Sequence, residues 1–163
     1  MANVIRYDRG AAVAYAEQWA LKRNPKYADF HGVGGDCTNF VSQCLYAGAR
    51  VMNHERDIGW YYIDANNRSP AWSGVVFLHR FLLGNKGNGP FAEAAEAGDM
   101  EKGDVIFLHD GNKVYHSLLV TDPNEGDPLI ATHSEDSWNR PLSSYDAIAT
   151  RPVKILGVRV PKR

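Results

Sequence analysis

The spacing of the apolar residues changes along the chain, from helical periodicity in the first half to strand alternation in the second. In residues 8–23, apolar side chains recur at steps of three and four, which predicts an amphipathic helix. Residues 36–48 repeat this spacing, with Asp36 suited to an N-cap and Gly48 to a left-handed C-cap. From residue 104 onward, short apolar segments are separated by turns. Helices followed by strands favour an α+β domain with an antiparallel sheet.

The remaining elements are less regular, but they fit one domain over residues 1–163. Residues 50–83 form an insertion rich in aromatic side chains, whose last part has helical spacing. The pattern predicts helices over 72–83 and 91–97, and strands over 104–108, 114–121, 129–134 and 155–160.

Composition excludes several classes of function. Lys and Arg number 18 and Asp and Glu 19, and this near-neutral balance argues against a nucleic-acid binder. No apolar run approaches the ~20 residues that cross a bilayer, so we expect no membrane partner. The first residues lack the apolar core of a signal peptide, as in a cytoplasmic protein or a trimmed domain of an exported one. The six histidines are scattered without zinc-ligand spacing, so we expect no metal or cofactor. We also expect a monomer.

Two cysteines lie seven residues apart on the second predicted helix. Two helical turns separate their Cα atoms by about 10 Å, which is too far for a disulfide. Cys37 falls in the first turn, where the helix dipole stabilises a thiolate and its own backbone N–H is free to bind an oxyanion. The preceding glycines, Gly34 and Gly35, leave the approach to its sulfur open. Cys37 is therefore a candidate nucleophile, the alternative being a small buried apolar residue, as we expect for Cys44.

Two histidines lie on strands that we expect to form a hairpin centred near Glu125. Opposed residues should then have numbers that sum to about 250, which brings His116 opposite His133 on one face. His116 would act as base and His133 would orient its ring, with Glu135 as the reserve orienter. A register slip of one residue would move these side chains to the other face. The alternative is that His116 only caps a strand and His133 only forms a hydrogen bond with a loop.

The segment Gly35-Asp36-Cys37-Thr38-Asn39-Phe40-Val41-Ser42-Gln43-Cys44-Leu45 strongly resembles the nucleophile motif of the bacterial "putative amidase domain" family, related to NlpC-type and CHAP cell-wall hydrolases. Segments matching in order and spacing are 60–62, 71–72, 102–106, 115–117 and 131–134.

The resemblance implies a papain-like fold and hydrolysis of an amide bond in peptidoglycan through a thioester. The bond would join N-acetylmuramic acid to L-alanine or lie within the stem peptide, and peptidoglycan or a muropeptide would be the substrate. Cys37, His116 and His133 carry over as the catalytic set, and Tyr27 stands about where relatives have an oxyanion-binding tyrosine. The substrate groove would include Gly34, Gly35, Asp36, Trp60, Trp72 and Ser117. An extracellular or cell-wall location would follow for a trimmed domain.

Two other functions are compatible with the same residues. One is a cysteine hydrolase or acyltransferase that acts on an isopeptide or γ-linked substrate outside the wall, since a fold does not fix its substrate. The other is an inactive binding module, against which the intact Cys37, His116 and His133 set counts.

Overall fold

A computed structural model describes residues 3–162 and has an α+β architecture. The helices are α1 (Arg9–Trp19), α2 (Cys37–Ala49), α3 (Pro70–Ser73) and α4 (Val75–Gly84), with 3₁₀ turns η1 (Ala97–Asp99), η2 (Asn124–Gly126) and η3 (Leu142–Ser144). The strands are β1 (Asn3–Ile5), β2 (Tyr62–Asp64), β3 (Asn67–Arg68), β4 (Gly89–Ala94), β5 (Val105–His109), β6 (Val114–Asp122), β7 (Leu129–Thr132), β8 (Ser137–Pro141) and β9 (Ala149–Val160). Among the described helices, none combines the length and apolar character of a membrane span.

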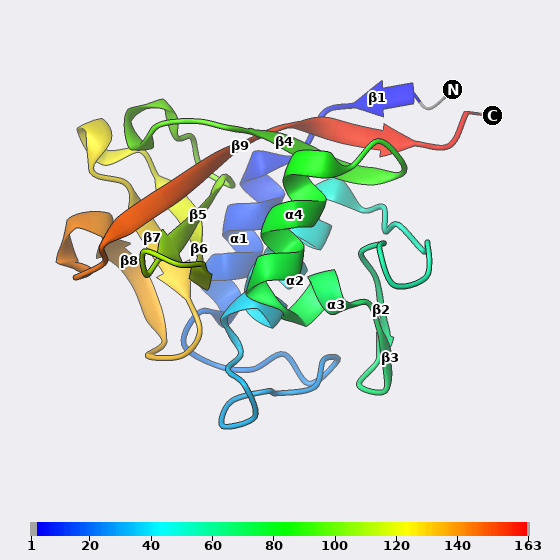
Figure 1. Cartoon of the computed structure of the whole chain (residues 1–163), viewed down its shortest axis with the longest axis horizontal. Coiled ribbons are helices and arrows are strands. Elements are labelled where there is room, and N and C mark those ends of the chain that lie inside the picture. Colours follow the sequence, from blue (N-terminus) through cyan, green and yellow to red (C-terminus); the bar gives the residue numbers. More distant parts are fainter. Residues whose placement is uncertain (1–2, 163) are drawn as a thin grey trace.

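Seven strands form one antiparallel sheet in the order β1-β9-β5-β6-β7-β8, and β4 also pairs with β9. The long strand β9 runs across the molecule and joins these pairings, while the β2–β3 hairpin lies at the end remote from β7 and β8 (Figure 1). The sheet thus supplies a continuous surface on which the helices pack.

The two faces of the sheet bury separate apolar clusters. On one face, Phe40 and Cys44 of α2 and Leu82 of α4 share a cluster with Phe107 and Leu119 of the sheet. The opposite face buries a smaller cluster built from Met100, Ile106, Leu108, Leu118, Val120 and Ile130, and Tyr145 packs against it. The helices α1, α2 and α4 therefore cover one face only. Because side chains alternate along a strand, every second residue of a strand points toward these helices.

Several predicted elements differ from the structure. The predicted helix over 91–97 is wrong: this stretch lies largely in β4, which pairs with residues 153–159 of β9. Helix α2 also continues past Gly48 to Ala49, and Arg50 takes the left-handed conformation (φ +60°) instead. Gly48 serves close packing, because a Cβ there would lie 2.5 Å from the Tyr7 ring. Asp36 is at the N-cap position but makes no side-chain cap hydrogen bond, because its carboxylate is engaged elsewhere.

The aromatic insertion contributes both core and groove wall, because its two tryptophans are buried whereas residues 73–77 line the groove beside Cys37. Trp60 and Trp72 are fully buried, with ring centroids 4.9 Å apart. The indole N–H groups donate to Ser42 Oγ and Asn39 Oδ1 of α2. Assignment of both tryptophans to the substrate groove is therefore wrong: large apolar rings with satisfied N–H groups are stabilised by burial.

Cys44 offers a test of the core. It lies fully buried on the sheet-facing side of α2, and we expect Cys44→Ala to lower the free energy of unfolding by about 1 kcal/mol because it leaves a small cavity. Urea denaturation measures this loss, with Ala47→Ser on the half-buried side of α2 as the control. An unchanged midpoint would contradict the packing.

Candidate active site

Cys37 is the first residue of α2 and lies at a groove of about 290 Å³. Its side chain is partly exposed, whereas Cys44 is buried, and that burial raises the pKa of the Cys44 thiol well above its usual value. Gly34 and Gly35 line the groove with φ of +83° and +92°, a backbone conformation that residues with a Cβ rarely adopt. Within residues 3–162, the Cys37 N–H has no hydrogen-bond acceptor. The structure therefore brings an accessible thiol and a free N–H donor to one point.

A chain of hydroxyl groups connects the thiol to the sheet. Cys37 Sγ lies 3.7 Å from Thr38 Oγ1, and this hydroxyl is 2.9 Å from Ser117 Oγ on β6. Ser117 is fully buried, and its carbonyl accepts a hydrogen bond from Thr132 Oγ1. A hydroxyl at this place can donate to a thiolate. Ser117 was expected in the groove, but it lies beneath it.

Asp36 and His133 form a buried pair directly behind Cys37. The Asp36 Oδ2 and His133 Nδ1 atoms are 2.5 Å apart, and both side chains are almost fully buried. His133 Nε2 lies 2.9 Å from the Trp19 carbonyl, and its ring stacks on Phe40 at 4.2 Å between centroids. Because a carbonyl oxygen only accepts, Nε2 is the donor to Trp19, and both ring nitrogens of His133 are engaged.

Asp36 has further partners that fix the start of α2. Its Oδ1 atom accepts hydrogen bonds from the Phe30 N–H and from Asn39 Nδ2, each at 2.9 Å. Arg23 Nε lies 3.6 Å from Oδ2. Asp36 is therefore the centre of a buried network and does not face the groove as we had expected.

The predicted contact between His116 and His133 is wrong. The hairpin pairs Leu119 with Ala131 and Val120 with Ile130, so the sum of 250 holds. Yet 116 and 133 sum to 249, and this single residue puts them on opposite faces. Both ring nitrogens of His133 are also engaged, with Asp36 and Trp19.

His116 lies with the smaller cluster, on the face of the sheet that the helices leave uncovered. It pairs with Leu108 of that cluster, and its ring meets the Tyr145 ring edge-on at 6.0 Å between centroids. Its neighbour Ser117 points the other way, toward Thr38. Burial, with a smaller contribution from Arg140, lowers the pKa of His116 to about 4, so the ring is neutral at pH 7. No hydrogen bond joins His116 to Cys37 in the described part of the chain.

Neither of the two other candidates, Tyr27 and Glu135, is among the residues that line the groove beside Cys37. Tyr27 is half-buried among aromatic rings, stacked on Trp72 at 6.0 Å, and burial raises its pKa. Glu135 has an 88% exposed side chain, 3.8 Å from Arg140. The chain over residues 3–162 also has no cluster of three or more His, Cys, Asp or Glu side chains that could hold a metal ion.

Sequence reasoning missed residues that shape the groove and the network. Tyr115 and Phe77 line the groove beside Cys37. Tyr115 sits where β6 departs from regular pairing with β5, between the Leu108–His116 and His109–Val114 pairs. Because Tyr115 is next to His116 on the strand, its side chain is expected on the opposite face from His116, and this alternation could have predicted its place in the groove. Asn39, which bonds to Asp36 and receives the Trp72 N–H, follows Cys37 within the motif.

Comparisons with known proteins give one family model and two similar proteins. A family model described as "Putative amidase domain" matches residues 6–156. The chain is 34% identical over 156 residues to the Bacillus subtilis (strain 168) protein "Uncharacterized protein YhbB". This match covers 92% of the chain and 49% of that protein. It is 27% identical over 148 residues to "Uncharacterized protein YjcM" of the same organism, covering 85% and 34%. The chain thus spans about half the length of YhbB and about a third of the length of YjcM. No solved structure matches.

The buried pair yields a stability prediction. We expect His133→Ala to lower the free energy of unfolding by roughly 3–5 kcal/mol, because it leaves the buried Asp36 carboxylate without its main partner. Urea denaturation at pH 7 measures the loss, and His31→Ala, which removes an exposed imidazole, is the control. A loss below about 1 kcal/mol would contradict the network.

His116 yields a pH prediction. Its pKa is lower in the folded chain, about 4, than the ordinary 6.5, so the unfolded chain binds the proton more tightly. Its contribution to stability is therefore complete above pH 6.5 and lost as the pH falls to about 4, a change of about 3 kcal/mol. Urea denaturation at pH 7 and pH 4 should show a smaller acid loss for His116→Gln than for the unaltered chain. Equal losses would contradict the shift.

Proposed function

Because the chain belongs to the "Putative amidase domain" family, we propose that it is a cysteine hydrolase that cleaves amide bonds, with Cys37 as nucleophile. One observation carries the proposal: the partly exposed thiol stands at the first residue of α2, in a groove approached through Gly34 and Gly35. A helix N-terminus stabilises a thiolate, and its free N–H groups stabilise negative charge on a substrate oxygen.

The reaction proceeds in two steps. The Cys37 thiolate attacks the amide carbonyl, and the Cys37 N–H donates to the oxyanion that forms. The C–N bond then breaks, the amine leaves with the proton taken from the thiol, and a thioester remains on Cys37. Water next attacks the thioester, which releases a carboxylic acid and restores the thiol. Thr38, whose hydroxyl lies 3.7 Å from Sγ, supports the thiolate by donating a hydrogen bond.

We assign the proton transfers to His116, on the strength of its motif. Its ring is neutral at pH 7, but the lowered pKa makes it a weak acceptor for the thiol proton while it stays buried. The ring packs beside Tyr145, so the assignment requires the start of β6 to rearrange when substrate binds. The irregular pairing at Tyr115 lies beside it and is the point where the backbone can change. His133 is left out of the proton transfers, since both of its nitrogens are engaged.

The motif around Cys37 also supports a fold and a substrate. A cysteine-bearing helix packed on an antiparallel sheet is the arrangement of papain-like hydrolases of NlpC and CHAP type, to which we relate this domain. We accordingly propose peptidoglycan as substrate, cleaved between N-acetylmuramic acid and L-alanine or within the stem peptide. Digestion of purified peptidoglycan with mass spectrometry of the fragments tests this. New alanine amino termini indicate the first bond, and shortened stem peptides indicate the second. Intact muropeptides, together with hydrolysis of other amides, would refute the wall substrate.

Variants of the two cysteines test the nucleophile. We expect Cys37→Ala to lower kcat/KM by at least about 10³-fold with an unchanged unfolding midpoint, because the thiol is lost from a partly exposed position. Cys44→Ala is the matched control and should retain activity. Iodoacetamide should label Cys37 and spare Cys44. Near-normal turnover by folded Cys37→Ala would refute the mechanism.

The base is tested separately. We expect His116→Ala to lower kcat/KM by roughly 10²- to 10⁴-fold, because the thiol proton then lacks an acceptor. His79→Ala, which changes another partly buried histidine on the helix-covered side, is the control and should keep most activity. If His116→Ala turns over normally while Cys37→Ala is inactive, Cys37 stands as nucleophile and the base must be another group.

A further inference from the structure

Two buried hydroxyl groups form a chain that ends at the Cys37 sulfur. Cys37 Sγ lies 3.7 Å from Thr38 Oγ1, and this oxygen lies 2.9 Å from Ser117 Oγ. Thr38 is 2% exposed and Ser117 is fully buried, so bulk water does not compete for either hydroxyl. Within residues 3–162, Ser117 Oγ has Thr38 as its one hydrogen-bond partner. The direction in which the chain donates therefore depends on Ser117.

The two hydroxyl protons can be arranged in two ways. If Thr38 donated to Ser117, the Ser117 O–H group would be buried without an acceptor, which is unfavourable. If Ser117 donates to Thr38, the Ser117 hydroxyl is satisfied and the Thr38 proton is directed toward Cys37 Sγ. This second arrangement presents a donor to the sulfur, and such a donor stabilises the thiolate more than the thiol.

The backbone around Ser117 fixes the position of its hydroxyl. On one side, β6 pairs Ser117 with Phe107 of β5. On the other side, the Ser117 carbonyl accepts a hydrogen bond from Thr132 Oγ1 on β7 at 2.8 Å. Ser117 is also absent from the residues that line the groove. It is therefore held at a set place beneath Thr38 and acts on the sulfur only through that residue.

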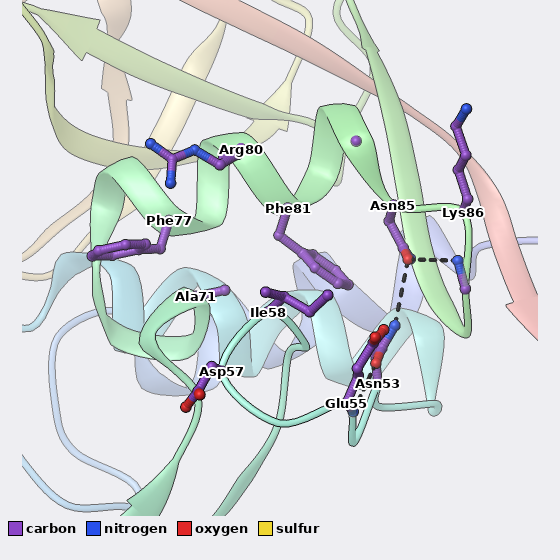
Figure 2. Close-up of a pocket in the computed structure, with 12 residues that line it drawn as sticks. Asn53, Glu55, Asp57, Ile58, Ala71, Phe77, Arg80, Phe81, Asn85 and Lys86 are labelled. Atoms are coloured by element: carbon purple, nitrogen blue, oxygen red, sulfur yellow. Dashed lines mark hydrogen bonds between the residues drawn. The ribbon is translucent and has the colours of Figure 1, made fainter.

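The groove itself offers no charge that could take over this role. Among the described residues, those that line the groove carry no charged side chain, and Tyr115 adds a titratable phenol. Arg80 lies beyond the groove wall: its guanidinium is 5.7 Å from the centre of the Phe77 ring. Figure 2 shows both side chains on α4, where they line a neighbouring cavity of about 460 Å³. A negative sulfur in the groove therefore depends on neutral donors.

The ionisable groups behind Cys37 are engaged with one another. Asp36 Oδ2 lies 2.5 Å from His133 Nδ1 and 3.6 Å from Arg23 Nε. His116 packs with the smaller cluster on the opposite face of the sheet. A substitution that removes only a hydroxyl of the chain leaves these groups in place, so its effect on the sulfur can be measured separately.

We propose that Ser117 is a positioning residue for Cys37, which fixes the Thr38 hydroxyl as a donor to the sulfur and so favours the thiolate. Its importance for turnover rests on the proposed amide hydrolysis at Cys37. Its effect on the thiolate does not, and can be measured without substrate.

The rate of Cys37 labelling by iodoacetamide, measured across pH, tests this proposal because the thiolate is the reacting form. We expect Thr38→Val to raise the pH of half-maximal labelling by about one unit, since it removes the hydrogen bond to the sulfur. Ser117→Ala should raise it by about half a unit, because the Thr38 hydroxyl remains but is no longer directed. Thr38→Ser keeps the hydroxyl and should behave as the unaltered chain. In the Thr38→Val background, Ser117→Ala should add nothing further.

Two controls separate this effect from loosened packing and from a distant charge. Ser42→Ala removes another fully buried hydroxyl from α2, one that accepts the Trp60 N–H, and should leave the labelling midpoint unchanged. Arg80→Gln removes the cation of the neighbouring cavity and should also leave it unchanged. Urea denaturation checks that each variant folds. Ser117→Cys, which keeps the size of the side chain but is a weaker donor, gives the same comparison if Ser117→Ala does not fold.

The outcomes distinguish this proposal from the enzymatic one. An unchanged midpoint in folded Ser117→Ala, or an equal shift in the Thr38→Val background, would overturn the positioning role even if Cys37 hydrolyses amides. An equal shift in Ser42→Ala or Arg80→Gln would overturn it too. Conversely, the expected shifts would establish the role of Ser117 even if the unaltered chain cleaves no amide.

Discussion

The buried contact between Asp36 and His133 holds together the parts of the molecule that define the candidate site. Asp36 immediately precedes Cys37, whereas His133 follows β7, ninety-seven residues later. The same imidazole reaches the Trp19 carbonyl at the end of α1. One side chain therefore connects the first helix, the cysteine helix and the sheet. Since a buried carboxylate without partners is costly, these segments must come together in one arrangement.

This arrangement explains why the thiol is accessible while its neighbours are not. Asp36 is turned inward by His133, Asn39 and the Phe30 N–H, so its carboxylate does not cap α2. Within residues 3–162, the first N–H groups of α2 are consequently left without an acceptor beside Cys37. An acid that would ordinarily satisfy them is occupied elsewhere, and the positive end of the helix stays available to a substrate oxygen.

The sequence predicted the α+β class, α2 with Cys37 in its first turn, and the hairpin register, because each depends on local periodicity and turn residues. The prediction for 91–97 was wrong because β4 is stabilised by pairing with β9, which lies sixty residues away. The tryptophans were misassigned because aromatic residues suit cores and grooves alike. The contact between His116 and His133 was wrong although the register was right, because 116 and 133 sum to 249, and a difference of one residue from 250 exchanges the faces.

The surroundings of His133 and His116 therefore give these two histidines different roles. His133, enclosed by Asp36, Trp19 and the Phe40 ring, has both ring nitrogens engaged and serves as a structural link. His116 has no carboxylate partner in the described chain, and burial keeps its ring neutral. A neutral ring without a fixed hydrogen bond is free to take up a proton once it reaches the thiol. If amide hydrolysis occurs here, its rate then depends on how readily the start of β6, with its irregular pairing at Tyr115, brings that ring toward Cys37.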